Sequence, residues 1–273
     1  MQNLLYYING EIISSDKAFI RIDDLGLLRG YGIFDFFRAI DGKPIFLEDH
    51  LDRLENSVRL MDIPLNKSRE DLKKEILNII KINPHKILGV KLVVTGGYSN
   101  DGYEPANEPN ILIMAKPFSF SDPENGLKLL SIEYQREIPE IKTTNYIVPI
   151  RSLKKQRETA SDDVLYYRNN LISESSRSNI FIIKNEKIIT PKNGVLFGVT
   201  RKHLLKILKN TFTVEERDIS VNELMNADEI FTTSSSKRII AINNVDGKIF
   251  SNGKPGKVTI KLQDLFLKYE NSL

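Results

Sequence analysis

Apolar residues recur along the chain with two different spacings. Runs rich in β-branched and aromatic residues predict strands over 33–40, 90–95, 110–115, 127–134, 164–167, 180–183, 188–189, 229–233 and 239–243. Apolar residues at every third or fourth position predict helices over 46–61, 68–82, 150–159, 200–208, 221–225 and 258–269. Asn9-Gly10 predicts the turn of a hairpin over 6–13. Strands and helices come in runs rather than in strict alternation, which favours an α+β fold with two domains.

A short polar segment that contains a proline, 118–123, divides this pattern into two parts. We expect a small N-terminal α/β domain over 1–117, a linker over 118–123, and a larger C-terminal domain over 124–273. A chain of 273 residues is long enough for two such domains.

The composition excludes several classes of protein. The net charge of +3 lacks the strong basic excess that is typical of a nucleic-acid-binding protein. No apolar run approaches the roughly 20 residues that span a membrane, and the first residues do not resemble a signal peptide, so we expect a soluble cytoplasmic protein. Cysteine is absent, which excludes disulfides, thiolate nucleophiles and Cys-ligated metals. The three histidines lie too far apart in sequence for a metal site, so no metal is expected.

Lysine chemistry is the remaining candidate for catalysis, because a Walker lysine, a dinucleotide-binding glycine motif and a hydrolase Gly-x-Ser-x-Gly motif are all missing from the sequence. Lys142 lies in an apolar and hydroxylated setting, which suits a partly neutral amine. Taken alone, it is one lysine among many, and the pattern favours a surface lysine. The segment 172–181 places Glu174 and Arg177 among serines before an apolar strand. A carboxylate there could pair with a pyridinium nitrogen, but the segment could also be an ordinary polar turn.

Two further features could bind phosphate, and one arginine stands beside an apolar helix face. Gly198-Val199-Thr200-Arg201 precedes a predicted helix, and the start of a helix offers free N–H groups and a positive dipole end to an anion, although Thr200 could equally be a plain N-cap. The hydroxyl cluster 232–236 follows a predicted strand and is either a phosphate-binding loop or a turn. Arg53 flanks the apolar stripe of a predicted helix, where a surface arginine is also common.

In this order and at these spacings, the motifs resemble the fold-type IV enzymes that depend on pyridoxal 5′-phosphate (PLP): D-amino-acid aminotransferases, branched-chain aminotransferases and aminodeoxychorismate lyases. The resemblance extends over nearly the whole chain. It is carried by Asn9-Gly10, the strand entry 29–35, the helix segment 50–54, Lys142-Thr143-Thr144-Asn145, Ser173-Glu174, Asn179-Ile180-Phe181, Gly198-Val199-Thr200-Arg201 and the segment 227–231.

The resemblance implies a role for each matching residue. Lys142 is similar to the catalytic lysine that holds the cofactor as a Schiff base and moves the substrate proton, and Glu174 to the partner of the pyridinium nitrogen. Arg53 is similar to the arginine that binds the phosphate. The other residues implied in cofactor binding are Ser178, Asn179, Val199, Thr200, Ser234 and Ser235. The resemblance also implies a PLP-binding C-terminal domain, a cofactor between two domains, amino-acid and 2-oxo-acid substrates, and a homodimer.

Departures from the family pattern bear on the substrate. Typical D-amino-acid aminotransferases carry a carboxylate-binding arginine where this chain has Gly96, and the lyases have arginines in the same stretch, which are missing here. Arg29 and Arg177 could instead bind the substrate carboxylate beside Phe34, because a guanidinium holds a carboxylate with two hydrogen bonds. We therefore expect a divergent D-amino-acid aminotransferase.

Three alternatives stay open. The first is an L-branched-chain aminotransferase, whose apolar pocket Tyr31, Phe34 and Phe36 could line. The second is a lyase of the aminodeoxychorismate type. The third is a non-catalytic descendant that only binds ligands, against which the presence of both Lys142 and Glu174 argues.

Overall fold

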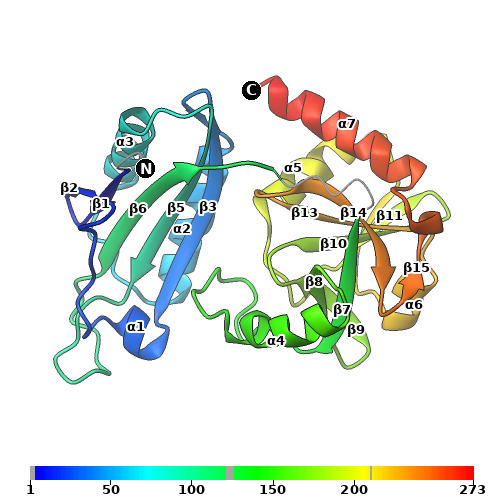
Figure 1. The fold of residues 1–273 in the computed structure, drawn as a ribbon, viewed down its shortest axis with the longest axis horizontal. Coiled ribbons are helices and arrows are strands. Elements are labelled where there is room, and N and C mark those ends of the chain that lie inside the picture. The colour runs from blue at the N-terminus through cyan, green and yellow to red at the C-terminus, as the bar shows by residue number, and fades with distance from the viewer. Residues whose placement is uncertain (1–3, 121–125, 210) are drawn as a thin grey trace. The chain divides into compact units, whose positions relative to one another are not determined.

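The structure is a computed structural model that describes residues 4–120, 126–209 and 211–273. The chain divides into two compact units (Figure 1): Met1–Ser119 with Ile141–Tyr146, and Phe120–Glu140 with Ile147–Leu273. The strands and helices confirm the α+β class. Residues 121–123 of the expected linker lie outside the described residues, so the linker stays a prediction.

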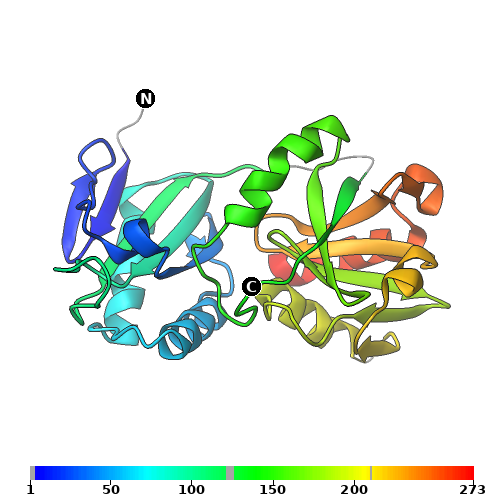
Figure 2. The ribbon, with the colours of Figure 1, turned by 90° about the horizontal axis from the view of Figure 1, so that it is seen from below.

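The first unit consists of one β-sheet and the helices packed on it. Its antiparallel strands lie in the order β2-β1-β6-β5-β3-β4, and α2 and α3 cover one face of this sheet (Figure 2). The bounds are β1 Leu5–Ile8, β2 Glu11–Ser14, α1 Leu25–Arg29, β3 Gly32–Ile40, β4 Lys43–Pro44, α2 Leu47–Leu60, α3 Arg69–Ile82, β5 Ile87–Thr95 and β6 Asn110–Pro117.

The alternation of residues along β3 decides which face is buried. Ile33 and Phe37 are almost completely buried and belong to the core cluster that also contains Leu51 and Leu54 of α2. Successive strand residues point to opposite faces, so Phe34 and Phe36 lie on the other face of the sheet and are only half-buried. The face that is not covered by α2 and α3 is therefore partly apolar.

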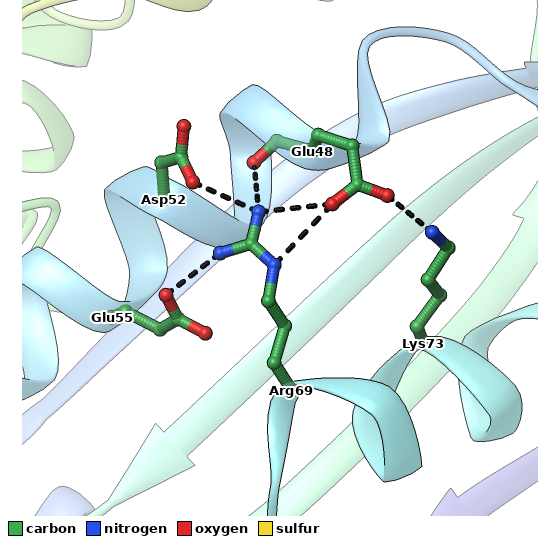
Figure 3. Close-up of polar contacts among 5 residues, drawn as sticks. All are labelled: Glu48, Asp52, Glu55, Arg69 and Lys73. Atoms are coloured by element: carbon green, nitrogen blue, oxygen red, sulfur yellow. Dashed lines mark hydrogen bonds and ion pairs between the residues drawn. The ribbon is translucent and has the colours of Figure 1, made fainter.

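Arg69 connects the two helices of the first unit at their surface (Figure 3). Its guanidinium is 2.7 Å from Glu55, 2.8 Å from Asp52 and 3.0 Å from Glu48, all on α2, and Lys73 also pairs with Glu48. These acids are more than a third exposed, so each pair adds at most about 1 kcal/mol.

The second unit is a sheet that closes on itself. Its strands follow the order β12-β11-β10-β13-β14-β7-β8-β9; β9 also pairs with β10, and β15 pairs with β14. The strands are β7 Leu127–Glu133, β8 Asp163–Arg168, β9 Leu171–Ser175, β10 Asn179–Lys184, β11 Lys187–Thr190, β12 Val214–Glu216, β13 Glu229–Ser234, β14 Arg238–Val245 and β15 Lys248–Ile249. The helices are α4 Ile147–Glu158, α5 Val199–Leu208, α6 Val221–Met225, the 3₁₀ turn Ser251–Gly253 and α7 Lys257–Asn271.

Both faces of this sheet are apolar, which explains the continuous apolar run in β10. Ile180 and Ile182 pack into one core cluster, whereas Phe181 stacks on Phe231 of β13 with ring centroids 4.8 Å apart. Helices α5 and α7 contact β13, and α7 also contacts β14. The start of α5 is thereby placed beside the ends of β10 and β13.

Two sequence-based expectations need correction, and one element, the short helix α1, was not predicted. Residues 171–175 form the strand β9, so Glu174 lies in a strand and only 176–178 form the polar turn. The N-cap of α5 is Gly198, so Thr200 lies inside the first turn and is not the cap. The five residues of β9 are too few to show an apolar period beside the serines that follow them. None of the described helices has the length and apolarity needed to cross a membrane.

Candidate active-site residues in each unit

Lys142 lies in the segment 141–146, which returns to the first unit and runs along the beginning of β3. The backbone N–H of Phe34 donates to the carbonyl of Lys142 at 2.9 Å, and that of Thr144 donates to Gly32 at 2.9 Å. The ammonium of Lys142 lies 4.6 Å from the centroid of the half-buried Phe34 ring. The strand-like contact with β3 thus fixes the backbone on both sides of this lysine.

Arg53 belongs to a buried polar cluster between α2 and β3. Its Nε and Nη2 donate to the two carboxylate oxygens of Asp35 at 2.8 and 2.7 Å, and His50 Nδ1 lies 2.7 Å from Asp35 Oδ1. The Arg53 side chain is 11% exposed and Asp35 only 2% exposed. Arg53 is therefore held in one orientation by a two-pronged ion pair, which rules out a freely moving surface arginine.

The burial of this cluster shifts two pKa values. Burial alone would raise the pKa of Asp35, but the charge of Arg53 and the hydrogen bonds from His50 and Arg53 outweigh it and hold that pKa well below its usual range. Burial lowers the pKa of His50, partly opposed by Asp35. At neutral pH the cluster consequently contains a carboxylate, a guanidinium and a neutral imidazole.

Arg29 is the last residue of α1 and is exposed. Its guanidinium has one weak hydrogen bond, to the carbonyl of Leu28 at 3.4 Å, and lies against Gly102 of the loop between β5 and β6. The N-cap of α1 is the buried Asp24, which also accepts a hydrogen bond from Thr95 at the end of β5. Arg29 is thus carried by a well-anchored turn of helix next to that loop.

Glu174 occupies the centre of the candidate site in the second unit. It is 5% exposed, and its carboxylate accepts a hydrogen bond from Arg136 Nε at 2.7 Å and one from the backbone N–H of Leu196 at 3.1 Å. Arg136 also donates to the carbonyl of Pro139. A buried carboxylate needs such partners, and these fix its orientation.

Asn179 connects Glu174 to the start of α5. It lies opposite Glu174 in the pairing of β9 with β10, and its amide donates to the carbonyl of Leu196 at 2.7 Å. A Cβ on Gly198 would come within 2.2 Å of Asn179 Oδ1, so only glycine fits where the loop enters the helix. Val199 and Thr200 follow as buried residues of the first turn, which has no side-chain cap.

Hydroxyl groups surround this helix start. Asn179 pairs with Thr233 of β13, and Thr233 Oγ1 and Ser178 Oγ are both buried without a hydrogen-bond partner among the described residues. Ser234 ends β13, and Ser235 lies half-buried in the turn that follows. Buried hydroxyls are rarely left unsatisfied, so these groups fit an anion with several acceptor oxygens.

The structure brings together most of the residues that the sequence singled out, within each unit. In the second unit Glu174, Ser178, Asn179, Val199 and Thr200 lie around one loop and helix start. Arg177 lies on the turn between β9 and β10; it is exposed, and its guanidinium forms no ion pair within the described chain.

Sequence reasoning missed three residues of these clusters: Asp35, His50 and Arg136. The signal that could have found Asp35 and His50 is a polar residue in each of two apolar patterns, one in a strand and one in a helix. Arg136 has no such signal, because a polar residue is ordinary in a loop.

Comparison with known proteins decides the family. Residues 32–245 match the family model described as amino-transferase class IV. The chain belongs to the class IV aminotransferases. It is therefore a transaminase, and the predicted dependence on PLP, which is typical of this family, is confirmed with it.

Individual relatives differ in their named substrate. A protein of Methanocaldococcus jannaschii, provisionally named a branched-chain-amino-acid aminotransferase, is 29% identical over 95% of this chain and 94% of its own. A D-alanine aminotransferase of Staphylococcus haemolyticus is 28% identical over 97% and 98%. The branched-chain aminotransferase of the archaeon Thermoproteus uzoniensis, solved with norvaline, has a TM-score of 0.90 at 22% identity and covers 98% and 95% of the two chains.

Proposed function

We propose that the protein transfers an amino group between a D-amino acid, such as D-alanine or D-glutamate, and a 2-oxo acid. The observation that carries the substrate assignment is the packing of Gly96. A Cβ at this position would lie 2.3 Å from the ring of Tyr31, so no arginine can stand there without displacing that ring. The family's usual carboxylate-binding arginine is thus excluded by packing, and the substrate carboxylate needs other cations.

Arg29 and Arg177 are suited to replace it. Both are exposed, and neither guanidinium is paired with a carboxylate within the described chain. Arg177 lies three residues from Glu174, on the turn that joins β9 to β10. A guanidinium without an acidic partner binds a carboxylate at a lower desolvation cost than one that must first break an ion pair.

The cofactor is assigned to residues whose polar groups suit a phosphorylated ring. The uncapped start of α5 at Val199 and Thr200 would hold the phosphate, together with Ser234 and Ser235. Arg53, fixed by Asp35, would supply a positive charge to it. Glu174 would accept a hydrogen bond from the ring nitrogen, with Ser178 and Asn179 beside it, and Lys142 would bind the cofactor covalently.

Each residue then has a distinct chemical task. When bound, PLP is an electron sink that stabilises the charge left at the substrate Cα after its proton has been removed. Lys142, as a neutral amine, would take the proton from the substrate Cα and hold it for transfer. Glu174, oriented by Arg136 and the Leu196 N–H, would accept a hydrogen bond from the ring nitrogen of the cofactor. Arg29, Arg177 and Phe34 would position the substrate.

Replacement of the two arginines tests the substrate assignment. We expect Arg177→Ala and Arg29→Ala each to raise the KM for D-alanine by about 10-fold or more, because a charged hydrogen-bonded contact contributes about 1.5–3 kcal/mol. Arg168→Ala, an exposed arginine at the end of β8, is the matched control and should leave the KM unchanged. An unchanged turnover of D-amino acids by Arg177→Ala would refute the arginine clamp.

An L-branched-chain aminotransferase is the second candidate, favoured by the aromatic side chains on the uncovered face of the first sheet. Phe34 packs against Tyr146 with ring centroids 5.7 Å apart, and Phe36 against Phe118 at 5.9 Å. Such a surface suits an aliphatic side chain. Turnover of L-leucine with 2-oxoglutarate, without turnover of D-alanine, would select this function.

We also propose that the protein is a homodimer. Phe19, Ile22, Leu27 and Tyr103 of the first unit are all at least two-thirds exposed. Isolated exposed apolar residues are common, but large side chains gathered in the loops around α1 are typical of an interface. Sedimentation at equilibrium should give twice the mass of 31.3 kDa, and a monomer would contradict the proposal.

A further inference from the structure

Asp163, at the start of β8, lies between the two turns that carry the proposed ligand-binding residues of the second unit. It is 3% exposed. Its Oδ1 accepts hydrogen bonds from the hydroxyl of Ser176 and from the backbone N–H of Val164, at 2.9 Å for the latter. Its Oδ2 accepts one from the ammonium of Lys237 at 3.1 Å. The two carboxylate oxygens therefore bind side chains from two different turns.

The first turn joins β9 to β10 and contains Ser176, Arg177 and Ser178. It is closed by a hydrogen bond from the backbone N–H of Ser175 to the carbonyl of Ser178 at 2.9 Å. The side chain of Ser176 points to Asp163, and Arg177 follows it directly. A loss of the Ser176 contact would consequently free the backbone next to Arg177.

The second turn joins β13 to β14 and contains Ser235, Ser236 and Lys237. A weak hydrogen bond from the Lys237 N–H to the carbonyl of Ser234, at 3.3 Å, closes it. Arg238 then adopts a left-handed conformation with a φ of 58°, which a residue with a side chain adopts only at a cost. The Lys237 N–H thus closes the turn only weakly, and the Lys237 side chain adds a second anchor through Asp163.

The ion pair of Asp163 and Lys237 is well shielded from water. The two side chains are 4% and 12% exposed. Surface pairs contribute little, whereas a buried pair cannot lose one partner without leaving an unpaired buried charge. The pair is therefore a strong and specific constraint on the distance between β8 and the second turn.

We propose that Asp163 is a positioning residue that holds both turns in register, with Ser176 connecting it to the Arg177 turn and Lys237 to the Ser235 turn. The proposal rests on the proposed function, because it assigns the substrate carboxylate to Arg177 and the cofactor phosphate to Ser235. Asp163 touches neither ligand in this account. Its two oxygens link the position of the Arg177 turn to that of the Ser235 turn.

Single variants test the Asp163–Ser176 contact and the Asp163–Lys237 contact separately. Ser176→Ala should raise the KM for D-alanine by about 10-fold and leave the Kd for PLP unchanged. Lys237→Met should raise the Kd for PLP, measured by absorbance titration of the apo-protein, by about 10-fold and leave that KM unchanged. Asp163→Asn should show both effects. Lys237→Arg keeps the charge and should restore the wild-type Kd.

Amide hydrogen exchange of the apo-proteins gives a readout that needs no activity. We expect faster exchange in 175–179 for Ser176→Ala, in 234–238 for Lys237→Met, and in both segments for Asp163→Asn. Inorganic phosphate should raise the Tm of the apo-protein less in Lys237→Met than in the wild type.

Two results would overturn the proposal. If Asp163→Asn lowers the Tm but leaves both the KM and the Kd at wild-type values, Asp163 is only structural. If Ser176→Ala and Lys237→Met each disturb both turns equally, the Ser176 and Lys237 contacts of Asp163 do not act on separate turns. A failure of the proposed function is recognised separately, because Arg177→Ala and Ser235→Ala would then themselves leave the KM and the Kd unchanged.

Discussion

The Asp35→Asn substitution tests the cluster that orients Arg53. The side chain of Asp35 is 2% exposed and accepts hydrogen bonds from both Arg53 and His50. An amide of the same size keeps the packing but leaves a largely buried guanidinium without its counter-charge, and breaking a buried pair in this way costs about 3–5 kcal/mol. Arg53 retains 11% exposure, which places the expected loss near the lower value, at about 3 kcal/mol.

Calorimetry of the apo-protein measures this loss. A destabilisation of about 3 kcal/mol should lower the Tm of the first unit by about 10 °C. Asp52→Asn is the matched control, since Asp52 pairs with Arg69 (Figure 3) but its side chain is 59% exposed, and its loss should stay below about 1 kcal/mol. The double variant Asp35→Asn with Arg53→Met should recover part of the loss. If Asp35→Asn is no more destabilising than Asp52→Asn, Asp35 does not hold Arg53 through a buried ion pair.

Three further outcomes are expected. Lys142→Ala should lower kcat for transamination by at least about 100-fold while the Tm of the apo-protein stays unchanged, as stopped assays and calorimetry would show. Gly198→Ala should destabilise the protein by about 1–3 kcal/mol and weaken PLP binding in an absorbance titration, because the added Cβ meets Asn179. Burial lowers the pKa of His50, so His50 stays neutral in the folded protein, whereas in the unfolded chain it takes up a proton below about pH 6.5. The free energy of unfolding should therefore fall as the pH drops through that value. Urea titrations should show that His50→Asn removes this part of the decrease.

The sequence was informative where periodicity is long or a turn is chemically distinctive. The 14-residue helices α2 and α3 were predicted to within one residue at each end, and Ser68 caps α3 with its side chain. The hairpin turn at Asn9-Gly10 was also correct, because both residues adopt positive φ angles of 50° and 105° that suit this pair. Interactions between residues close in sequence determine such elements, so they can be predicted from the local sequence.

The candidate site was predicted only as separate residues. The spacing of Glu174 and Leu196 along the chain gives no sign that a backbone N–H of the loop binds the carboxylate. Likewise, Arg136 lies 38 positions before Glu174 and is one arginine among many until the fold brings the two together. The role of Asp163 could not be foreseen either, because its partners Ser176 and Lys237 come from turns that are distant in sequence.

A half-reaction tests the central claim most directly. The purified protein would be loaded with PLP, and its visible spectrum would be recorded before and after addition of D-alanine, D-glutamate, L-leucine or L-glutamate. We expect the yellow band of the bound cofactor to disappear with the two D-amino acids and to persist with the two L-amino acids, and we expect Lys142→Ala not to form this band. Disappearance of the band with only the L-amino acids would contradict the assignment and identify a branched-chain type of aminotransferase.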